Sequence, residues 1–325
     1  MKRINNLWEK VIALDNLYLA DNIARKGKRN SYGVIKHDKN KDANILELQK
    51  KLKNKTYKTS EYKVFKIYEP KEREIYQLPY IDRIVHHAIM NILEPIWVSV
   101  FNKDTYSCIK GKGIHAALNS IKKDIANDKE GTKYYMQLDV RKFYPNIDHD
   151  ILKQIIRRKI KDKDLLDLLD GIIVSAVGVP IGNYLSQYFA NLYLSYFDHW
   201  IKEEKKVKYY RYADDMVIFS SDKESLHQLF NEIKQYLFKN LKLEIKGNHK
   251  ICPLDNHGLN FVGYIIRSSH VLMRKSIKKA FAKKVAKKAK IKTLSAYYGW
   301  AKHCNSKNLL RKLEYYEITK QRISA

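Results

Sequence analysis

Several features are scarce or missing in this sequence, and each absence excludes a class of protein. No run of about 18 apolar residues occurs and no signal-peptide pattern opens the chain, so we expect neither a membrane-spanning helix nor export. The three cysteines, Cys108, Cys252 and Cys304, are far apart and odd in number, which argues against a disulfide framework or a cysteine-based zinc site. No Pro-rich or Gly/Ser-rich linker divides the chain. We therefore expect one continuous globular body in a reducing cytoplasm.

Acidic residues are also scarce relative to basic ones. The sequence has 63 Lys and Arg against 35 Asp and Glu, a formal net charge of +28, which attracts polyanions over a long range. Nucleic acid is the first partner to consider. The 24 tyrosines and 10 phenylalanines could stack on bases, although most of them are expected in the core.

Hydrophobic periodicity predicts a helical N-terminal region followed by short strands. Residues 1–55 show helical spacing, interrupted by a basic polar stretch at 25–41 that we interpret as a loop. Residues 56–80 alternate as short strands around the turn Glu69–Glu72, and residues 81–100 return to a helix with one apolar face.

The middle of the chain places acidic residues at strand ends. The strand 134–138 ends at Asp139, a helix is expected after Asp148, and 207–220 read as two strands folded about Ala213 and Asp214. Further helices are expected at 183–203 and 224–240, with short strands near 261–267 and basic helices from about residue 275.

Asp139, Asp214 and Asp215 are the residues with the clearest chemical potential. Neighbouring carboxylates in a partly buried site repel each other, and a divalent cation relieves that repulsion. Hard oxygen ligands suit Mg²⁺, and two such ions can activate a 3′-hydroxyl and stabilise a leaving pyrophosphate. An isolated Asp-Asp pair, however, more often forms a solvated turn.

Several segments in sequence order resemble reverse transcriptases over about residues 65–315. The segment Leu138–Tyr144 resembles the first metal-binding motif of that family, and Tyr212–Asp215 resembles its second aspartate box. The resemblance implies that Asp139 and Asp214 are the principal ligands of two Mg²⁺ ions, with Asp215 nearby and the Val140 carbonyl contributing. Mn²⁺ may replace Mg²⁺. Tyr144 falls at the family's steric-gate position, where a ring favours dNTP over NTP; without that context, Tyr144 reads as ordinary packing before Pro145.

The same resemblance assigns substrate contacts outside the aspartates. It implies that Arg73 contacts the incoming triphosphate and that Lys110 and Lys112, in a glycine-containing element, contact the template. Residues 258–264 resemble the primer-grip hairpin, with Gly263 and Tyr264 at its end. A lysine near the triphosphate is expected in residues 241–250, where Lys250 fits the spacing better and Lys246 stays an alternative.

One departure from the common pattern narrows the family. Most reverse transcriptases carry Gln-Gly followed by Ser-Pro where this chain has Ile181-Gly182 followed by Ser186-Gln187. This variant resembles the reverse transcriptases of diversity-generating retroelements, as do residues 188–194 and 295–306. Ile181, Gly182 and Gln187 then lie in the nucleotide site. The resemblance implies error-prone cDNA synthesis, mutagenic at template adenines, with a template RNA, the nascent cDNA, dNTPs and a small basic accessory protein that forms a pentamer.

These observations predict an α+β right-hand polymerase fold with an antiparallel palm sheet, fingers and a helical thumb. The expected divisions are an N-terminal helical extension at 1–55, fingers and palm at 56–265, and a basic helical thumb at 266–325. The lysines of the thumb could bind duplex phosphates or form a solvated face. We expect the chain to be bacterial or phage-encoded. Other readings stay open: a phage-defence reverse transcriptase, a relative of group II intron enzymes, or a non-catalytic RNA-binding protein.

Overall fold

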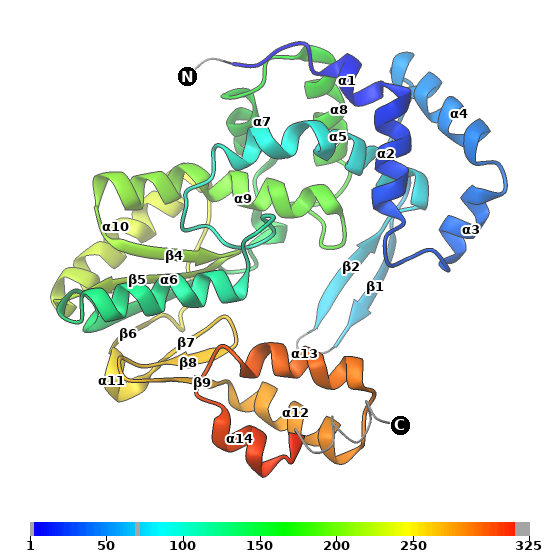
Figure 1. Ribbon diagram of the computed structural model, residues 1–325. Helices are drawn as coiled ribbons and strands as arrows, with labels where there is room; N and C mark the ends of the chain where they lie inside the picture. Colours follow the sequence, from blue (N-terminus) through cyan, green and yellow to red (C-terminus); the bar gives the residue numbers. More distant parts are fainter. Residues whose placement is uncertain (1–2, 69–71, 316–325) are drawn as a thin grey trace. The chain divides into compact units, whose positions relative to one another are not determined.

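The computed structural model describes residues 3–68 and 72–315, which divide into two compact units that alternate along the chain (Figure 1). Unit 1 comprises Met1–Lys103, Val140–Trp200 and Gln235–Glu244, and unit 2 comprises Asp104–Asp139, Ile201–Lys234 and Ile245–Ala325. The three consecutive segments predicted from the sequence do not coincide with these units. They stay a prediction.

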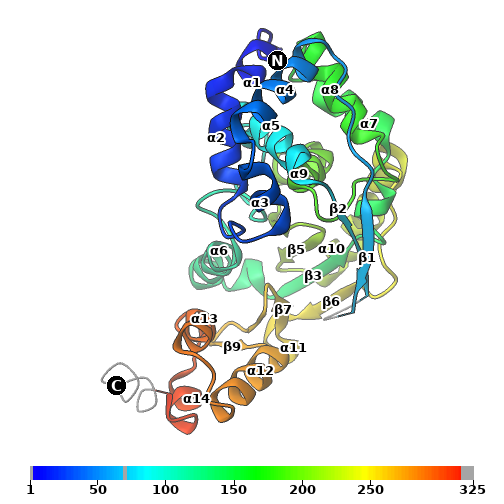
Figure 2. The same ribbon diagram turned by 90° about the vertical axis from the view of Figure 1, so that its right-hand side faces the viewer.

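The N-terminal part of unit 1 is helical. It contains α1 (Trp8–Ile12), α2 (Leu14–Ala24), α3 (Tyr32–Asp38), α4 (Lys41–Lys53) and the long α5 (Tyr80–Val98). Helix α2 packs along α5, with α1 and α3 also against it (Figure 2). The helix predicted at 81–100 is confirmed. The loop predicted across 25–41 is wrong where α3 forms, because packing of Val34 and His37 stabilises a seven-residue helix that is too short to show a clear periodicity in the sequence.

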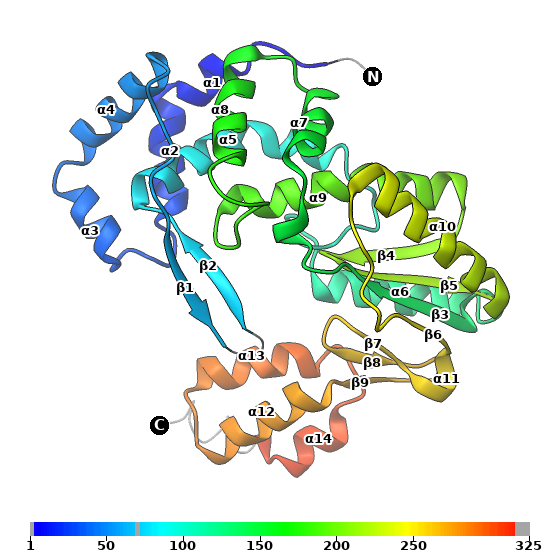
Figure 3. The ribbon, with the colours of Figure 1, turned by 180° about the vertical axis from the view of Figure 1, so that it is seen from behind.

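The remainder of unit 1 includes a hairpin and the helices α7, α8 and α9. Strands β1 (Lys63–Ile67) and β2 (Arg73–Gln77) pair antiparallel as predicted; residues 69–71 of the expected turn lie outside the described residues. Helix α7 (His149–Arg157) begins where expected, because the Asp148 carboxylate accepts hydrogen bonds from its first-turn amides. With α8 (Lys163–Ile173) it accompanies α9 (Tyr184–His199), which packs on α5 and α7 (Figure 3) and is followed by a π-helical turn, Trp200–Glu204.

Unit 2 contains a four-stranded antiparallel sheet. Its strands are β4 (Lys208–Tyr212), β5 (Asp215–Ser220), β3 (Tyr134–Asp139) and β6 (Lys250–Pro253), in that spatial order. The predicted strands at 134–138 and 207–220 and their antiparallel arrangement are confirmed. Strand β6 was not anticipated, because it is short, ends in proline, and is recognisable only from its pairing with β3.

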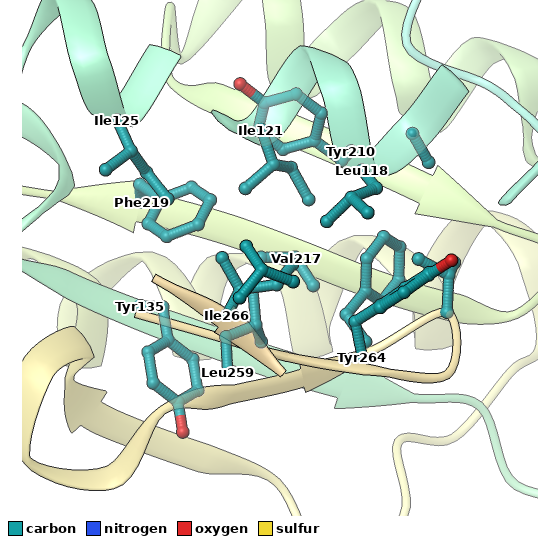
Figure 4. Close-up of a cluster of buried hydrophobic side chains, with 14 of the residues drawn as sticks. Leu118, Ile121, Ile125, Tyr135, Tyr210, Val217, Phe219, Leu259, Tyr264 and Ile266 are labelled. Atoms are coloured by element: carbon teal, nitrogen blue, oxygen red, sulfur yellow. The ribbon is translucent and has the colours of Figure 1, made fainter. Parts of the chain in front are cut away.

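One face of this sheet is covered by α6 (Ile114–Asn127) and by two short strands, β7 (Leu259–Phe261) and β8 (Tyr264–Ile266). Figure 4 shows Leu118 and Ile121 of α6 directed toward the aromatic and aliphatic side chains of the sheet. Tyr135 of β3 and Phe219 of β5 contribute to this core. Because alternate residues of a strand share a face, Asp139 and Asp215 lie on the same face as this core, at one end of their strands.

The C-terminal part of unit 2 is a small sheet followed by helices. Strand β9 (Val271–Met273) joins β7 and β8, and α11 (Leu254–His257) precedes them. Helices α12 (Lys275–Ala286), α13 (Ile291–Ala301) and α14 (Lys307–Lys312) form their own core, in which Phe281 stacks on Tyr297 with ring centroids 5.3 Å apart. The predicted basic helices are confirmed, and the lysines of α12 are exposed while Phe281 and Val285 are buried.

The predicted helix at 224–240 is also confirmed as α10 (Lys223–Leu241). Within the described residues, no helix is both long enough and apolar enough to cross a membrane.

Candidate active site

Strand register brings the three aspartates to one end of the four-stranded sheet. Asp139 lies opposite Asp215 in the β3–β5 pair, and Tyr212 lies opposite Asp215 in the β4–β5 pair. Ala213 and Asp214 are therefore the two residues of the turn that joins β4 to β5. Directly opposed residues of antiparallel strands have Cα atoms about 4.5–5.5 Å apart. The expected convergence of these sequence-distant carboxylates is found, and we call Asp139, Asp214 and Asp215 the aspartate corner.

A buried arginine stabilises the turn that contains Asp214. Ala213 has φ +55°, a left-handed conformation that residues other than glycine seldom adopt. The Arg211 side chain is fully buried, and its Nη1 donates a hydrogen bond to the Ala213 carbonyl at 2.9 Å. Arg211 was not predicted from the sequence. Its signal was a charged residue between tyrosines in a strand that is otherwise buried.

The pKa values of two carboxyl groups in the aspartate corner are raised. Burial and, secondarily, the neighbouring Asp139 raise the pKa of Asp214 to about 6. Burial also raises the pKa of Asp215 to about 7, although a hydrogen bond from Gln137 Nε2 to Asp215 Oδ1, at 3.0 Å, opposes the shift. A nearby positive charge would therefore favour the ionised forms of the Asp214 and Asp215 carboxylates.

Lys246 supplies one such charge. Its Nζ lies 2.5 Å from Asp139 Oδ2, and its backbone N–H donates to the Asp139 carbonyl oxygen at 2.8 Å. Lys250, which fits the family spacing better, begins β6 opposite Gln137 and has an exposed side chain. The structure thus brings Lys246, rather than Lys250, to the aspartates. Spacing could not distinguish them, because the path of the segment before β6 decides which lysine returns to Asp139.

The donors of the aspartate corner fit a hard divalent cation. Asp139 Oδ1 is buried and has no hydrogen-bond partner among the described residues, so an oxygen that favours a cation is left without one. Nevertheless, no three His, Cys, Asp or Glu side chains of the described chain are already gathered as a ligand set. Asp215 is held by Gln137 and Asp139 by Lys246. Val140 follows Asp139 directly; its side chain is a buried hydrocarbon without a ligand atom, so its backbone carbonyl is the group that could bind a cation.

Within unit 1, the structure brings together three of the predicted nucleotide-site residues. The Tyr144 carbonyl accepts from Val179 N at 2.9 Å, and the Ile181 carbonyl accepts from Tyr76 N of β2 at 2.8 Å. Gly182 has φ +124°, and a Cβ there would lie 2.5 Å from the Tyr76 carbonyl oxygen. The glycine of this motif is therefore required because two backbones approach each other closely.

Arg73 and Gln187 also belong to unit 1. Arg73 is the first residue of β2, opposite Ile67, with an exposed side chain. Gln187 is exposed in the first turn of α9. Arg73 therefore shares β2 with Tyr76, the strand residue on which Ile181 docks.

The two predicted template lysines of unit 2 differ in their surroundings. Lys110 is exposed. Lys112 is half-buried: its Nζ donates to the Thr105 carbonyl at 3.2 Å and lies 5.7 Å from the Tyr106 ring centroid. Burial lowers the pKa of Lys112. Lys110 is thus the freer of the two to meet a phosphate.

Gly263 and Tyr264, predicted as part of the primer grip, are packed against α13. A Cβ on Gly263, which has φ +88°, would lie 2.1 Å from the Trp300 ring. Tyr264 is fully buried, and its hydroxyl donates to the Trp300 carbonyl at 3.1 Å. Both residues therefore fix the hairpin to the C-terminal helix α13. Trp300 was not singled out from the sequence.

Comparison with known proteins agrees with this geometry. The family model for reverse transcriptase (RNA-dependent DNA polymerase) matches residues 43–266. Protein YkfC of Escherichia coli (strain K12) is 25% identical over 228 residues, which cover 56% of this chain and 60% of YkfC. The group II intron-encoded protein LtrA of Lactococcus lactis subsp. cremoris is 24% identical over 254 residues, covering 74% of this chain and 40% of LtrA. This chain thus spans less than two thirds of either relative.

Solved structures show the same fold at much lower identity. Telomerase from Candida tropicalis, in complex with the TWJ fragment of telomeric RNA, superposes with a TM-score of 0.53 at 12% identity, covering 86% of this chain and 57% of the telomerase chain. The likeness confirms the predicted α+β polymerase fold. Since the family model covers more than half of the sequence, this chain belongs to the reverse transcriptase family of RNA-dependent DNA polymerases.

Proposed function

We propose that this chain synthesises DNA on an RNA template, with the aspartate corner as its metal-dependent catalytic centre. The observation that carries the proposal is the meeting of Asp139, Asp214 and Asp215 at one sheet end, with the orphaned Asp139 Oδ1 beside them. In such an enzyme the primer 3′-hydroxyl oxygen attacks the α-phosphorus of a dNTP. The bond to the bridging oxygen breaks, and pyrophosphate leaves.

Each of the predicted residues would have a separate task. Asp139 and Asp214, with Asp215 and the Val140 carbonyl, would hold two Mg²⁺ ions, with Mn²⁺ as the alternative ion. When bound, such ions polarise phosphoryl oxygens and favour ionisation of the attacking hydroxyl. Lys246 holds its ammonium group against Asp139 and can give a proton to the departing pyrophosphate. Arg73 would neutralise triphosphate charge, Tyr144 would exclude the 2′-hydroxyl, and Lys110 would meet a template phosphate.

Primer extension on an RNA template tests this function. Purified protein with Mg²⁺ or Mn²⁺ is expected to add dNTPs to an annealed DNA primer. The matched control is Asp214→Asn, which removes a charge at nearly constant volume and should lower the rate at least about a hundredfold while the protein stays folded. No extension by the wild type with either ion would refute the proposal, and an active Asp214→Asn variant would refute the metal assignment.

A narrower proposal concerns the kind of reverse transcriptase. Ile181, Gly182 and Gln187 support an enzyme of a diversity-generating retroelement, one that makes cDNA with errors at template adenines. Ile181 presents an aliphatic side chain where a glutamine could hydrogen-bond to the nascent pair, so discrimination there relies on shape. One such bond contributes about 0.5–1.5 kcal/mol, so Ile181 alone does not explain selectivity for adenine. In this setting a template RNA and a small basic pentameric accessory protein would assist the chain, in the cytoplasm of a bacterium or of a phage-infected cell.

Sequencing the cDNA made from a template of known composition tests the narrower proposal. Errors concentrated opposite adenines, with or without the added accessory protein, would support it. Errors spread evenly over the four template bases would contradict it, while leaving the polymerase assignment intact.

The similarity to LtrA favours a second candidate, a reverse transcriptase related to group II intron proteins. The two candidates differ in their genomic surroundings. Near-repeats that differ at adenines should flank the gene in a diversity-generating element, whereas intron RNA structure should surround it in the second case. A defence enzyme would have neither.

A further inference from the structure

Gln137 is a polar residue of β3 that neither the family resemblance nor the proposed function uses. It lies two residues before Asp139, so both side chains project from the same face of the sheet. It is partly buried, opposite Val217 in β5 and Lys250 in β6. Gln137 therefore lies between β5, which begins with Asp215, and β6, which precedes β7.

The Gln137 amide nitrogen makes two hydrogen bonds of equal length. Nε2 donates to Asp215 Oδ1 at 3.0 Å and to the Asn260 carbonyl oxygen of β7 at 3.0 Å. Both partners are acceptors. Only an NH₂ group can satisfy them together, so the amide orientation is determined by its surroundings.

Asn260 is held in turn from the other side. Arg274 Nε donates to Asn260 Oδ1 at 2.7 Å, and Arg274 N donates to the Gly263 carbonyl oxygen at 3.0 Å. Arg274 is also the residue that precedes α12. A continuous chain of hydrogen bonds thus runs from Asp215 through Gln137 and Asn260 to the β7–β8 hairpin and the first C-terminal helix, all within unit 2.

We propose that Gln137 is a positioning residue that couples the Asp215 carboxylate to the β7–β8 hairpin through Asn260 and Arg274. This inference rests on the proposed polymerase function. In it, the hairpin and the aspartate corner must keep a fixed spacing during each nucleotide addition, and small misplacements of reacting groups cost rate rather than affinity. In this role Gln137 acts by holding Asp215 in place.

Single-nucleotide incorporation on a primed RNA template tests the coupling. Gln137→Met keeps the length of the side chain and removes both donors, so kcat should fall about tenfold or more while the KM for dNTP changes less than about threefold. Gln137→Glu turns a carboxylate toward two acceptors and should lower kcat further. The matched control is Gln228→Met at an exposed position of α10, which should behave as wild type. A Gln137→Met variant with kcat within twofold of wild type would overturn the inference.

The hydrogen bond between Arg274 and Asn260 allows a second kinetic test. Arg274→Gln should lower kcat by a smaller factor, about threefold, and should have little further effect when Gln137→Met is already present. Independent, multiplicative effects of the two substitutions would contradict a connected chain.

Unfolding measurements separate this inference from the proposed function. In urea without divalent ions, Gln137→Met and Asp215→Ala should be non-additive in their effect on the unfolding midpoint, because each removes the hydrogen bond between the two side chains. If the wild type extends no primer, the proposed function fails while this coupling can still be found. Additive midpoints would overturn the coupling whether or not the enzyme is active.

Discussion

The aspartate corner of unit 2 and the Ile181–Gly182 segment of unit 1 are both short motifs, yet different forces constrain them. In the aspartate corner the constraint is electrostatic. Burial raises the pKa values of Asp214 and Asp215, and Asp139 Oδ1 has no hydrogen-bond partner among the described residues. In the Ile181–Gly182 segment the constraint is steric, because the Gly182 backbone, at φ +124°, lies against the Tyr76 carbonyl. A motif can therefore persist because of what it binds or because of how closely it packs.

A substitution at Gly182 gives the largest expected effect on stability. Gly182→Ala places a Cβ 2.5 Å from the Tyr76 carbonyl oxygen at a φ that alanine seldom adopts. We expect the free energy of unfolding to fall by about 2–4 kcal/mol, measured by urea denaturation. The matched control is Gly171→Ala in α8, where no atom lies within 4 Å of the added Cβ and helix propensity predicts a gain of about 0.5–1 kcal/mol. Equal effects at the two glycines would show that steric crowding does not constrain position 182.

A substitution of Lys246 tests the electrostatic constraint on the aspartate corner. Lys246→Met removes the ammonium that lies 2.5 Å from Asp139, and we expect the rate of nucleotide addition to fall by about tenfold to a hundredfold. Lys250→Met, at the exposed start of β6, should change the rate less than about threefold. The opposite order would restore Lys250 as the lysine that serves the triphosphate.

The pH dependence of stability sharpens the same contrast. Without divalent ions, Asp214 and Asp215 have folded-state pKa values of about 6 and 7, above the value near 3.8 expected for the unfolded chain. The folded state therefore binds more protons between about pH 4 and pH 7, so stability should decrease as the pH rises through that window. Asp215→Asn should be more stable than wild type by about 1–3 kcal/mol at pH 8, and this advantage should vanish toward pH 4.

Urea denaturation at pH 5 to 8 in a chelator measures this difference. Adding Mn²⁺ or Mg²⁺ at pH 8 should stabilise the wild type more than Asp215→Asn. An advantage that is independent of pH would mean that charge does not constrain the aspartate corner.

The smallest expected effect concerns Ile181. Ile181→Gln restores the residue that most reverse transcriptases carry and adds one polar contact, so the error rate should fall by about tenfold at most. The measurement is cDNA sequencing on a defined template. Because the substitution keeps the hydrogen bond from Tyr76 N to the carbonyl of residue 181, stability should change little. A large loss of stability would show that the side chain also has a packing role.

Local patterns predicted much of the fold because they depend on neighbouring residues alone. The periodicity of α5 and α10, the alternation in β3 and β5, and the apolar stripe of α12 all appear in the sequence and in the structure. Helix α3 and strand β6 were missed, because packing and strand pairing with distant segments stabilise them more than their own composition does.

The sequence by itself determined the identity of the aspartates, the glycine at 182, the excess of positive charge and the membership of a polymerase family. Only the tertiary structure decided which distant groups meet those residues: Lys246 beside Asp139, Arg211 beneath the Ala213 turn, and Gln137 between Asp215 and Asn260. The physical reason is range. Backbone propensity and periodicity act over a few residues, whereas the hydrogen bonds and charges that tune a site join segments whose proximity exists only after the sheet has formed.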